Sequence, residues 1–427
     1  MTDVSDLVSA AEQPGSPGVW QTFSESPLAV KALFGGVFVN RAGGFLNIFL
    51  VLYLTSKGHS PAQAAFALGC YGFGGVAGVL VGAPLADRMG ARNATVLSMS
   101  SAAVLIVSLL YLPSYYLLLA AVTVVGLMSL IFRPAAATLL SQLTPDDRQL
   151  MIFAIYRFGL NIGATAAPLL GYALYYLDHQ HYTLLFWGEA LFSLIYAVLA
   201  QLTLPNRVQP RTESESETAE ATGGYLAVLR DRRYVLFILA VGIGAAVYVQ
   251  YLSTLPLDVR AHHIAVLWYT VVVALNGACV ILFELPLTKL SQRWPVRLNC
   301  CLAFGLVGLG VLCYGLPLGP AVLIIGTLIW TSGEITGSPS LFAYPALVAP
   351  PQLRSRYIGS FQFMFGLGSA LGPMIGGTLF VHLGHRVWLA IVLGSVVATT
   401  LSFSGVRSPK SLAGSPASAI PAVEQAG

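Results

Sequence analysis

The chain has 427 residues, of which 56% are hydrophobic and only 9% are charged, with a formal net charge of +4. A soluble domain carries about 25% charged residues, so a soluble fold of this length cannot hide so much apolar surface. The small net charge, without a basic run that alternates with aromatic residues, argues against a nucleic-acid-binding protein. The composition predicts a polytopic helical membrane protein.

The predicted elements follow from runs of about 20 mostly apolar residues. Residues 1–27 are acidic and lack a basic stretch before an apolar segment, so we expect a cytosolic tail and not a signal peptide. Twelve transmembrane helices are predicted after this tail, at 28–55, 61–86, 93–112, 115–141, 149–177, 182–204, 233–257, 263–288, 297–315, 319–347, 355–382 and 386–406.

The only long polar segment between these spans is 205–232, whose acidic run at 213–217 favours a flexible linker. It separates a six-helix half at 28–204 from a second six-helix half at 233–406. Residues 407–427 are rich in Ser, Pro and Ala and are expected to form a second cytosolic tail. The predicted fold class is therefore an all-α membrane protein of twelve helices in two halves.

The distribution of Lys and Arg predicts the orientation of the chain. With the N-terminus in the cytosol, sixteen of the 22 basic residues lie on the cytosolic side, and only Lys57, Arg260 and Arg386 lie outside. Both termini and the linker are therefore expected in the cytosol, in a multi-pass protein of the plasma (inner) membrane.

An internal repeat relates the two halves. Arg88 matches Arg293, Arg92 matches Arg297 and Pro134 matches Pro339, each 205 residues further along the chain. Six spans in each half give both halves the same orientation, so the repeat is parallel and its axis lies along the membrane normal. Substrate sites in such folds lie near the midplane, between the halves.

Two equivalent cytosolic loops are predicted to control gating. The first contains a carboxylate beside two guanidinium groups, which can bind a basic group or a helix N-terminus of the other half. Gln292 stands where the first loop has Asp87, so a charged latch would be asymmetric, and a loop without a gating role is the alternative. The predicted gating residues are Asp87, Arg88, Arg92, Arg293, Arg297 and Glu284.

The first of these loops, with Gly82, Asp87, Arg88, Gly90 and Arg92, resembles the signature between spans 2 and 3 of the major facilitator superfamily. The resemblance covers about 28–406 and implies the fold of that family and transport by alternating access.

Two subfamilies of this superfamily are similar to parts of the chain. Arg133-Pro134 and Arg157-x3-Asn161 look like bacterial multidrug-efflux members. Residues 40–54 and the segment from Trp330 to Glu334 resemble proton-coupled peptide transporters more faintly.

Ionisable groups inside the bilayer are costly and mark function by default. Arg41 and Glu334 lie near the middles of the first and tenth spans, which the resemblance places on opposite sides of a central cavity. We expect both to face that cavity and to pair through it, with a proton on Glu334 weakening the pair. A static pair that only satisfies burial is the alternative. Glu189 is expected to be a second titrating group or a partner of a neighbouring helix.

The remaining polar residues of the spans are assigned more coarsely. Uncharged side chains of the cavity would suit an apolar or amphipathic solute, and they are Asn40, Tyr248, Gln250, Tyr251 and Asn276. Arg133 and Arg157 are expected to be buried basic residues that bind lipid phosphate or acidic groups of neighbouring helices. Asp258, His262 and His263 are expected to be solvated at the outer end, and the cysteines have no metal-ligand spacing.

These features favour a secondary transporter over an enzyme, because the spans hold no metal-spaced His pair and the chain holds no phosphate-binding loop for ATP hydrolysis. A channel has no need of a two-fold repeat with a single mid-membrane carboxylate. We predict proton-coupled export of drug-like or amphipathic molecules, with proton-coupled uptake of peptides or similar solutes as the alternative. No cofactor or metal is expected, and the partners are a small-molecule substrate, protons and lipid around a monomer.

Overall fold

The computed structural model describes residues 23–145, 148–205, 224–291, 293–317, 319–350 and 353–407. All regular structure in this part of the chain is helical. Most of the two expected tails, most of the linker with its acidic run, and Gln292 lie outside the described residues.

The N-terminal half contains α3 (Leu28–Ala42), α4 (Leu46–Ser56), α5 (Pro61–Met89), α6 (Ala91–Ser108), α7 (Tyr115–Leu130), α8 (Phe132–Gln142), α9 (Gln149–Leu177) and α10 (Thr183–Thr203). The C-terminal half contains α12 (Gly224–Arg230), α13 (Arg232–Tyr248), α14 (Gln250–Ala261), α15 (Val266–Ser291), α16 (Val296–Tyr314), α17 (Pro320–Val348), α18 (Arg354–Leu383), the 3₁₀ turn η4 (Gly384–Arg386) and α19 (Val387–Gly405).

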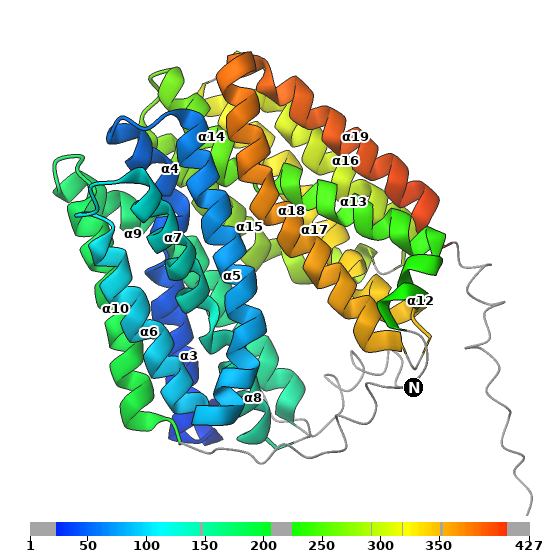
Figure 1. The fold of residues 1–427 in the computed structure, drawn as a ribbon. Coiled ribbons are helices and arrows are strands. Elements are labelled where there is room, and N and C mark those ends of the chain that lie inside the picture. The colour runs from blue at the N-terminus through cyan, green and yellow to red at the C-terminus, as the bar shows by residue number, and fades with distance from the viewer. Residues whose placement is uncertain are drawn as a thin grey trace, which may run out of the picture.

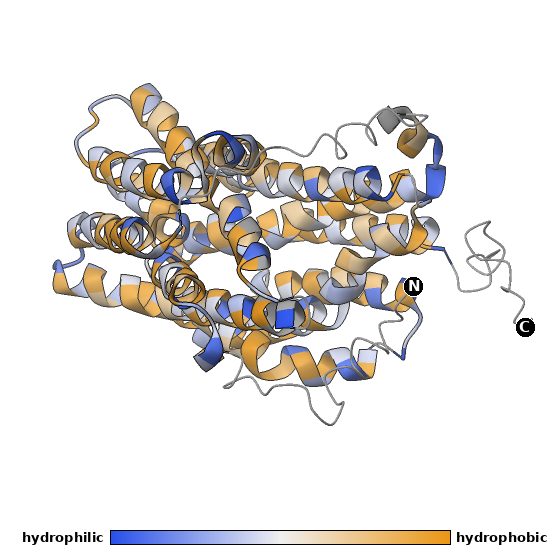
Figure 2. Cartoon of the chain, turned by 90° about the horizontal axis from the view of Figure 1, so that it is seen from below, coloured by the Kyte–Doolittle hydropathy of each residue, from blue (hydrophilic) through white to orange (hydrophobic). Residues whose placement is uncertain are grey.

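These helices are consistent with the twelve expected spans. Ten segments of the described chain are long and apolar enough to cross a membrane, and one of them, Arg354–Gly405, holds both α18 and α19. The 29-residue α9 is not among the ten but matches the expected span at 149–177. Large apolar side chains such as Leu202, Leu285 and Leu393 are exposed on the outside of the bundle, and apolar residues dominate the helices in Figure 2.

Three spans that were expected to be continuous are each built from two helices. The first breaks between α3 and α4 at Gly43-Gly44, where two residues without side chains interrupt the helix. The fourth breaks between α7 and α8, where the ring of Pro134 is incompatible with a helical carbonyl at Leu130, the last residue of α7. The seventh breaks between α13 and α14 at Val249.

The two halves lie side by side and diverge toward one end of the bundle (Figure 1). We call this end, where α10 stops and α12 begins, the linker end, and the opposite end the distal end. Near the distal end α5 and α18 pack closely. A side-chain carbon added at Gly69 would lie only 2.6 Å from the carbonyl oxygen of Ala370, so only glycine fits at this position. The hydroxyl of Tyr269 on α15 also donates to the carbonyl of Ile48 on α4 at 3.1 Å. The halves are therefore joined at the distal end.

Candidate functional site

A cavity of about 360 Å³, here called the carboxylate cavity, lies in the C-terminal half where it faces the other half. Its wall is mostly apolar and comes from α13, α15, α16, α17 and α18, with Arg157 and Asn161 of α9 on the side of the other half. Phe342, Phe361 and Phe365 line it toward the linker end. Such a space suits a solute with a large apolar part.

Glu334 supplies the carboxylate of this cavity. The hydroxyl of Tyr248 on α13 donates to Glu334 Oε1 at 3.0 Å, and Asn276 Nδ2 on α15 donates to Glu334 Oε2 at 2.7 Å. Among the described residues no cation forms an ion pair with Glu334. The folded chain thus brings three of the predicted cavity residues together, around a carboxyl group that has only neutral partners.

An aromatic cluster that the sequence interpretation missed adjoins this carboxylate. The Trp330 ring packs against Tyr248 and Tyr251, with centroid distances of 5.5 and 5.3 Å. The Trp330 indole N–H donates to the hydroxyl of Tyr314 at 2.9 Å, which fixes the orientation of the indole. Trp330 precedes Glu334 by four residues, so both lie on one face of α17. This four-residue spacing is the feature of the sequence that could have indicated an aromatic ring beside the carboxylate.

A second cavity of about 120 Å³, the arginine cavity, lies mainly in the N-terminal half. Arg41, Arg133, Asn40 and Glu189 line it, together with Tyr251 of the other half. The Nε atom of Arg41 is buried without a hydrogen-bond partner among the described residues. The expected pairing of Arg41 with Glu334 is not formed in this structure, because Glu334 is bound by its own half and lines a different cavity.

Glu189 binds the backbone at the break in the first span. Its side chain is buried, and its carboxylate accepts a hydrogen bond from the backbone N–H of Leu46, the first residue of α4. The first N–H groups of a helix have no partner within the helix and carry partial positive charge, so a carboxylate stabilises them. Glu189 therefore supplies a hydrogen-bond acceptor to the N-terminal end of α4, which begins after the helix break at Gly43-Gly44.

Gln250 does not line either described cavity, contrary to expectation. Its Nε2 donates to the carbonyls of Ala246 and Gly372, both at 2.8 Å. Its Oε1 accepts hydrogen bonds from Ser253 and Thr254. All polar atoms of this buried side chain are thus hydrogen-bonded, and the bond to Gly372 joins α14 to α18.

Arg157 was expected to be a buried cation, and this is wrong. Its side chain is 69% exposed and lines the carboxylate cavity, where it forms an ion pair with Glu284, which is 23% exposed. Arg157 lies on α9 and Glu284 on α15, so the pair joins the two halves. The other predicted buried cation, Arg133, is half-buried in the arginine cavity.

The predicted gating loops lie at the linker end. The side chains of Asp87, Arg88 and Arg293 are exposed and form no hydrogen bond or ion pair among the described residues. Arg92 is half-buried, with an unpartnered Nε among the same residues. Arg297 binds within its own half, where Nε and Nη2 donate to the carbonyl of Val406 at 3.0 and 2.8 Å. The latch across the halves stays a prediction.

Asp258 was expected to be solvated, and this is wrong. Its side chain is fully buried at the distal end, where Trp388 Nε1 donates to Oδ2 at 2.7 Å. Trp388 lies on α19, 130 residues further along the chain, so no local sequence pattern predicts this contact. His262 and His263, on the same turn, are exposed as expected.

The family model of the Major Facilitator Superfamily matches residues 33–373. The chain belongs to the Major Facilitator Superfamily. It is 21% identical over 383 residues to the MFS-type transporter YqjV of Bacillus subtilis, covering 88% of this chain and 92% of the relative. It is 25% identical to the multidrug resistance protein MdtH of Shigella sonnei, covering 86% and 93%. A Na⁺, Li⁺, K⁺/H⁺ antiporter of Planococcus maritimus is 23% identical, covering 85% and 91%.

Solved structures of other transporters share the fold of this superfamily member. A POT family transporter in complex with 5-aminolevulinic acid has a TM-score of 0.69 at 16% identity, covering 90% of this chain and 98% of that chain. A mutant of the nucleoside transporter NupG has a TM-score of 0.72 at 17% identity, covering 89% and 99%. These relatives are all transporters and not enzymes, and the chain is a multi-pass membrane protein.

Proposed function

We propose that this chain is a secondary active transporter that exports drug-like or amphipathic molecules in exchange for protons, by alternating access. The observation that carries the proposal is the Glu334 carboxyl group, which borders a largely apolar cavity and whose hydrogen-bond partners in the described part of the chain are all neutral. The similarity to a protein named for multidrug resistance and to a cation/H⁺ antiporter supports the direction of transport.

The chemistry of Glu334 supplies a proton switch. An ionised carboxylate accepts hydrogen bonds from both Tyr248 and Asn276, whereas a protonated carboxyl group must itself donate one. A proton therefore changes the bonds that tie α17 to α13 and α15. An uncompensated carboxylate at this depth also attracts either a proton or a cationic group of the solute, so the two compete. Competition for one carboxylate is sufficient to couple their opposite movements.

Alternating access requires that contacts at the two ends of the bundle form in turn. Contacts such as Tyr269 with Ile48 join the halves at the distal end, while the carboxylate cavity extends toward the linker end. The excess of Lys and Arg at the linker end supports a cytosolic position for this end and for both termini. With that orientation in the plasma (inner) membrane, the present conformation faces the cytosol, and the Asp87 loop would bind the other half when this end closes. One chain contains both halves, which supports a monomer.

Uptake of peptides is the second candidate, because the arginine cavity offers two cations. A peptide carries a terminal carboxylate that guanidinium groups bind well, and Arg41 and Arg133 line this cavity. The fold similarity to a POT family transporter agrees with this candidate but does not specify a substrate.

Transport by purified protein in vesicles with an imposed pH gradient tests the proposal. We expect a lipophilic fluorescent cation to accumulate when the lumen is acidic, whereas a zwitterionic tripeptide does not. Glu334→Gln should lose gradient-driven accumulation but keep exchange of labelled for unlabelled cation. Glu189→Gln is the matched control, because its amide oxygen can still accept from Leu46, and it should remain coupled. Flux that ignores the gradient, or normal coupling in Glu334→Gln, would refute the proton switch.

A further inference from the structure

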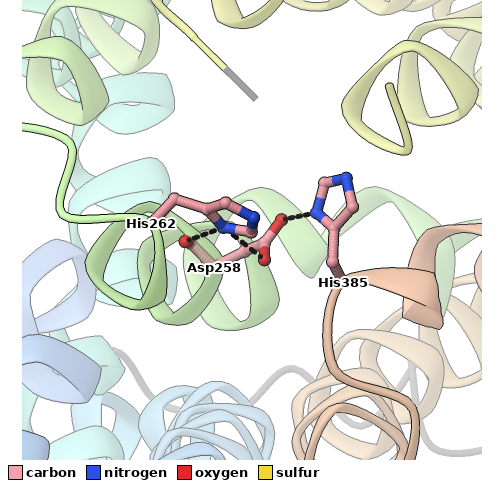
Figure 3. Close-up of side chains that lie close together, drawn as sticks. All are labelled: Asp258, His262 and His385. Atoms are coloured by element: carbon pink, nitrogen blue, oxygen red, sulfur yellow. Dashed lines mark hydrogen bonds and ion pairs between the residues drawn. The ribbon is translucent and has the colours of Figure 1, made fainter. Parts of the chain in front are cut away.

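Asp258, His262 and His385 form a three-residue cluster at the distal end, outside both described cavities. Figure 3 shows the Asp258 carboxylate between the two imidazole rings. His385 Nδ1 lies 2.8 Å from Asp258 Oδ2, and His262 Nδ1 lies 3.2 Å from Asp258 Oδ1. The ring centroids of the two histidines are 4.7 Å apart. Each residue can offer one ligand atom, and these atoms all lie within 4.8 Å of one another.

We propose that Asp258, His262 and His385 bind one divalent transition-metal ion of the Zn²⁺ type, which ties the end of α14 to the connection between α18 and α19. Two imidazoles and one carboxylate are a ligand set for such ions, whereas Mg²⁺ and Ca²⁺ prefer oxygen ligands alone. In a tetrahedral zinc site the bonds are about 2.0–2.1 Å long, so neighbouring ligand atoms lie about 3.3 Å apart. The two carboxylate–imidazole distances are already close to that spacing.

The hydrogen-bond inventory of the cluster points to a missing positive charge. His385 Nδ1 faces Asp258 Oδ2, and His385 Nε2 faces the carbonyl of Leu316 at 3.0 Å. His262 Nδ1 faces the carbonyl oxygen of Asp258 at 2.9 Å. A neutral imidazole has one N–H, which is too few for the two acceptors that face His385, whereas the Asp258 carbonyl already accepts the backbone N–H of His262 at 3.0 Å. A metal ion between Nδ1 of His385 and the Asp258 carboxylate removes this shortage of N–H groups, because the single N–H of His385 then lies on Nε2 and donates to the Leu316 carbonyl.

The surroundings match what metal-binding side chains need. A ligating histidine usually donates its other N–H to a carbonyl or carboxylate, and a ligating carboxylate is itself hydrogen-bonded. Leu316 supplies the carbonyl for His385, and buried Trp388 donates to Asp258 Oδ2. Asp258 Oδ1 is buried and has no hydrogen-bond partner among the described residues. The side chains of His262 and His385 are 37% and 27% exposed, which leaves a path from solution to the buried carboxylate.

The test measures metal binding by the purified full-length chain in detergent after chelator treatment, so it does not depend on any transported substrate. Calorimetric titration with ZnCl₂ should show saturable binding of one ion per chain. His385→Gln and His262→Gln should each weaken the affinity at least tenfold, and Trp388→Phe should weaken it roughly 10- to 100-fold. Co²⁺ should give the visible absorption of a nitrogen- and oxygen-bound ion in the unsubstituted protein and not in His385→Gln.

His263→Asn is the matched control. His263 lies next to His262, is exposed, and has a φ of 56°, which Asn tolerates. This variant should bind Zn²⁺ as the unsubstituted chain does. Size-exclusion and circular-dichroism profiles establish that each variant is folded, and the exposed His262 gives a second ligand variant should His385→Gln not fold. Absence of saturable binding, or equal affinity in both histidine variants and the unsubstituted chain, would overturn the proposal and leave a hydrogen-bonded cluster without a metal ion.

Discussion

Arg260 on α14 donates hydrogen bonds to Thr55 Oγ1 at 2.8 Å and to the Leu52 carbonyl at 3.2 Å, both in the last turns of α4. A cation of the C-terminal half thus binds the C-terminal end of a helix in the N-terminal half, where the helix dipole favours positive charge. This relationship joins the halves at the distal end, and sequence interpretation assigned Arg260 no role beyond its side of the membrane.

Arg260→Gln should favour opening of the distal end. Because Arg260 is exposed, the contact contributes about 1 kcal/mol, so the ratio of open to closed molecules should rise roughly fivefold. Spin labels at Lys57→Cys and Ala265→Cys, in a chain without its native cysteines, report the separation by pulsed electron resonance. Arg386→Gln removes another exposed distal cation, which forms no hydrogen bond or ion pair among the described residues, and should leave the distances unchanged. An identical distance distribution in Arg260→Gln would show that the contact does not hold the halves closed.

Glu189→Ala should destabilise the protein without abolishing coupling. The substitution leaves the buried N–H of Leu46 without its acceptor, which costs about 1–3 kcal/mol. Glu189→Gln keeps an acceptor and should lose less stability. Thermal unfolding followed by native tryptophan fluorescence compares the two variants. If Glu189→Gln instead abolishes proton-driven transport while remaining stable, Glu189 is a coupling residue, which is one of the two roles that the sequence suggested.

Gly78→Ala should be more harmful than Gly305→Ala, a glycine substitution in a span where the added carbon meets open space. A side-chain carbon at Gly78 on α5 would collide with the backbone of Leu127 on α7, which is not a flexible group. Overpacking of this kind costs about 1–3 kcal/mol. Gly305→Ala on α16 is the control, since nothing lies within 4 Å of the added carbon. Yield and melting temperature in detergent should fall only for Gly78→Ala, and equal effects would contradict the close contact of α5 with α7.

Arg297→Gln and Arg293→Gln test whether Arg297, a predicted gating residue, has a structural role that Arg293 lacks. Arg297 binds the Val406 carbonyl just beyond α19 and packs on the Phe403 ring at 5.2 Å, so its loss should cost about 1 kcal/mol. Arg293 is exposed, and its substitution should not change stability. Limited proteolysis near the C-terminal end of α19 should be faster only for Arg297→Gln. Equal protection of both variants would show that Arg297 does not hold this helix end.

Much of the architecture was accessible from the sequence because each span is a local property of the chain. About 20 apolar residues are enough to cross the bilayer, whatever the other helices do, and the ends of most expected spans lie close to helix ends. Pro134 and Gly43-Gly44 were visible too, although the helix breaks that they cause were not predicted. The residues of the loop around Asp87 indicated the superfamily by themselves, and the family match confirmed it.

The partners of the buried polar groups could not be predicted in the same way. A helix that is apolar on nearly every side does not reveal which face turns inward, because its rotation is decided by packing against neighbours. Glu334 and Asn276 are 58 residues apart, Asp258 and Trp388 are 130 apart, and Leu46 and Glu189 are 143 apart.

The sequence by itself therefore determined an all-helical membrane fold of this superfamily with costly ionisable groups inside it, and it predicts the division into two six-helix halves. Only the tertiary structure decided which of these groups faces a cavity, which caps a helix and which lies between two histidines. The physical reason is that a polar atom inside the bilayer must find a partner within the protein, and only the packed helices bring that partner close.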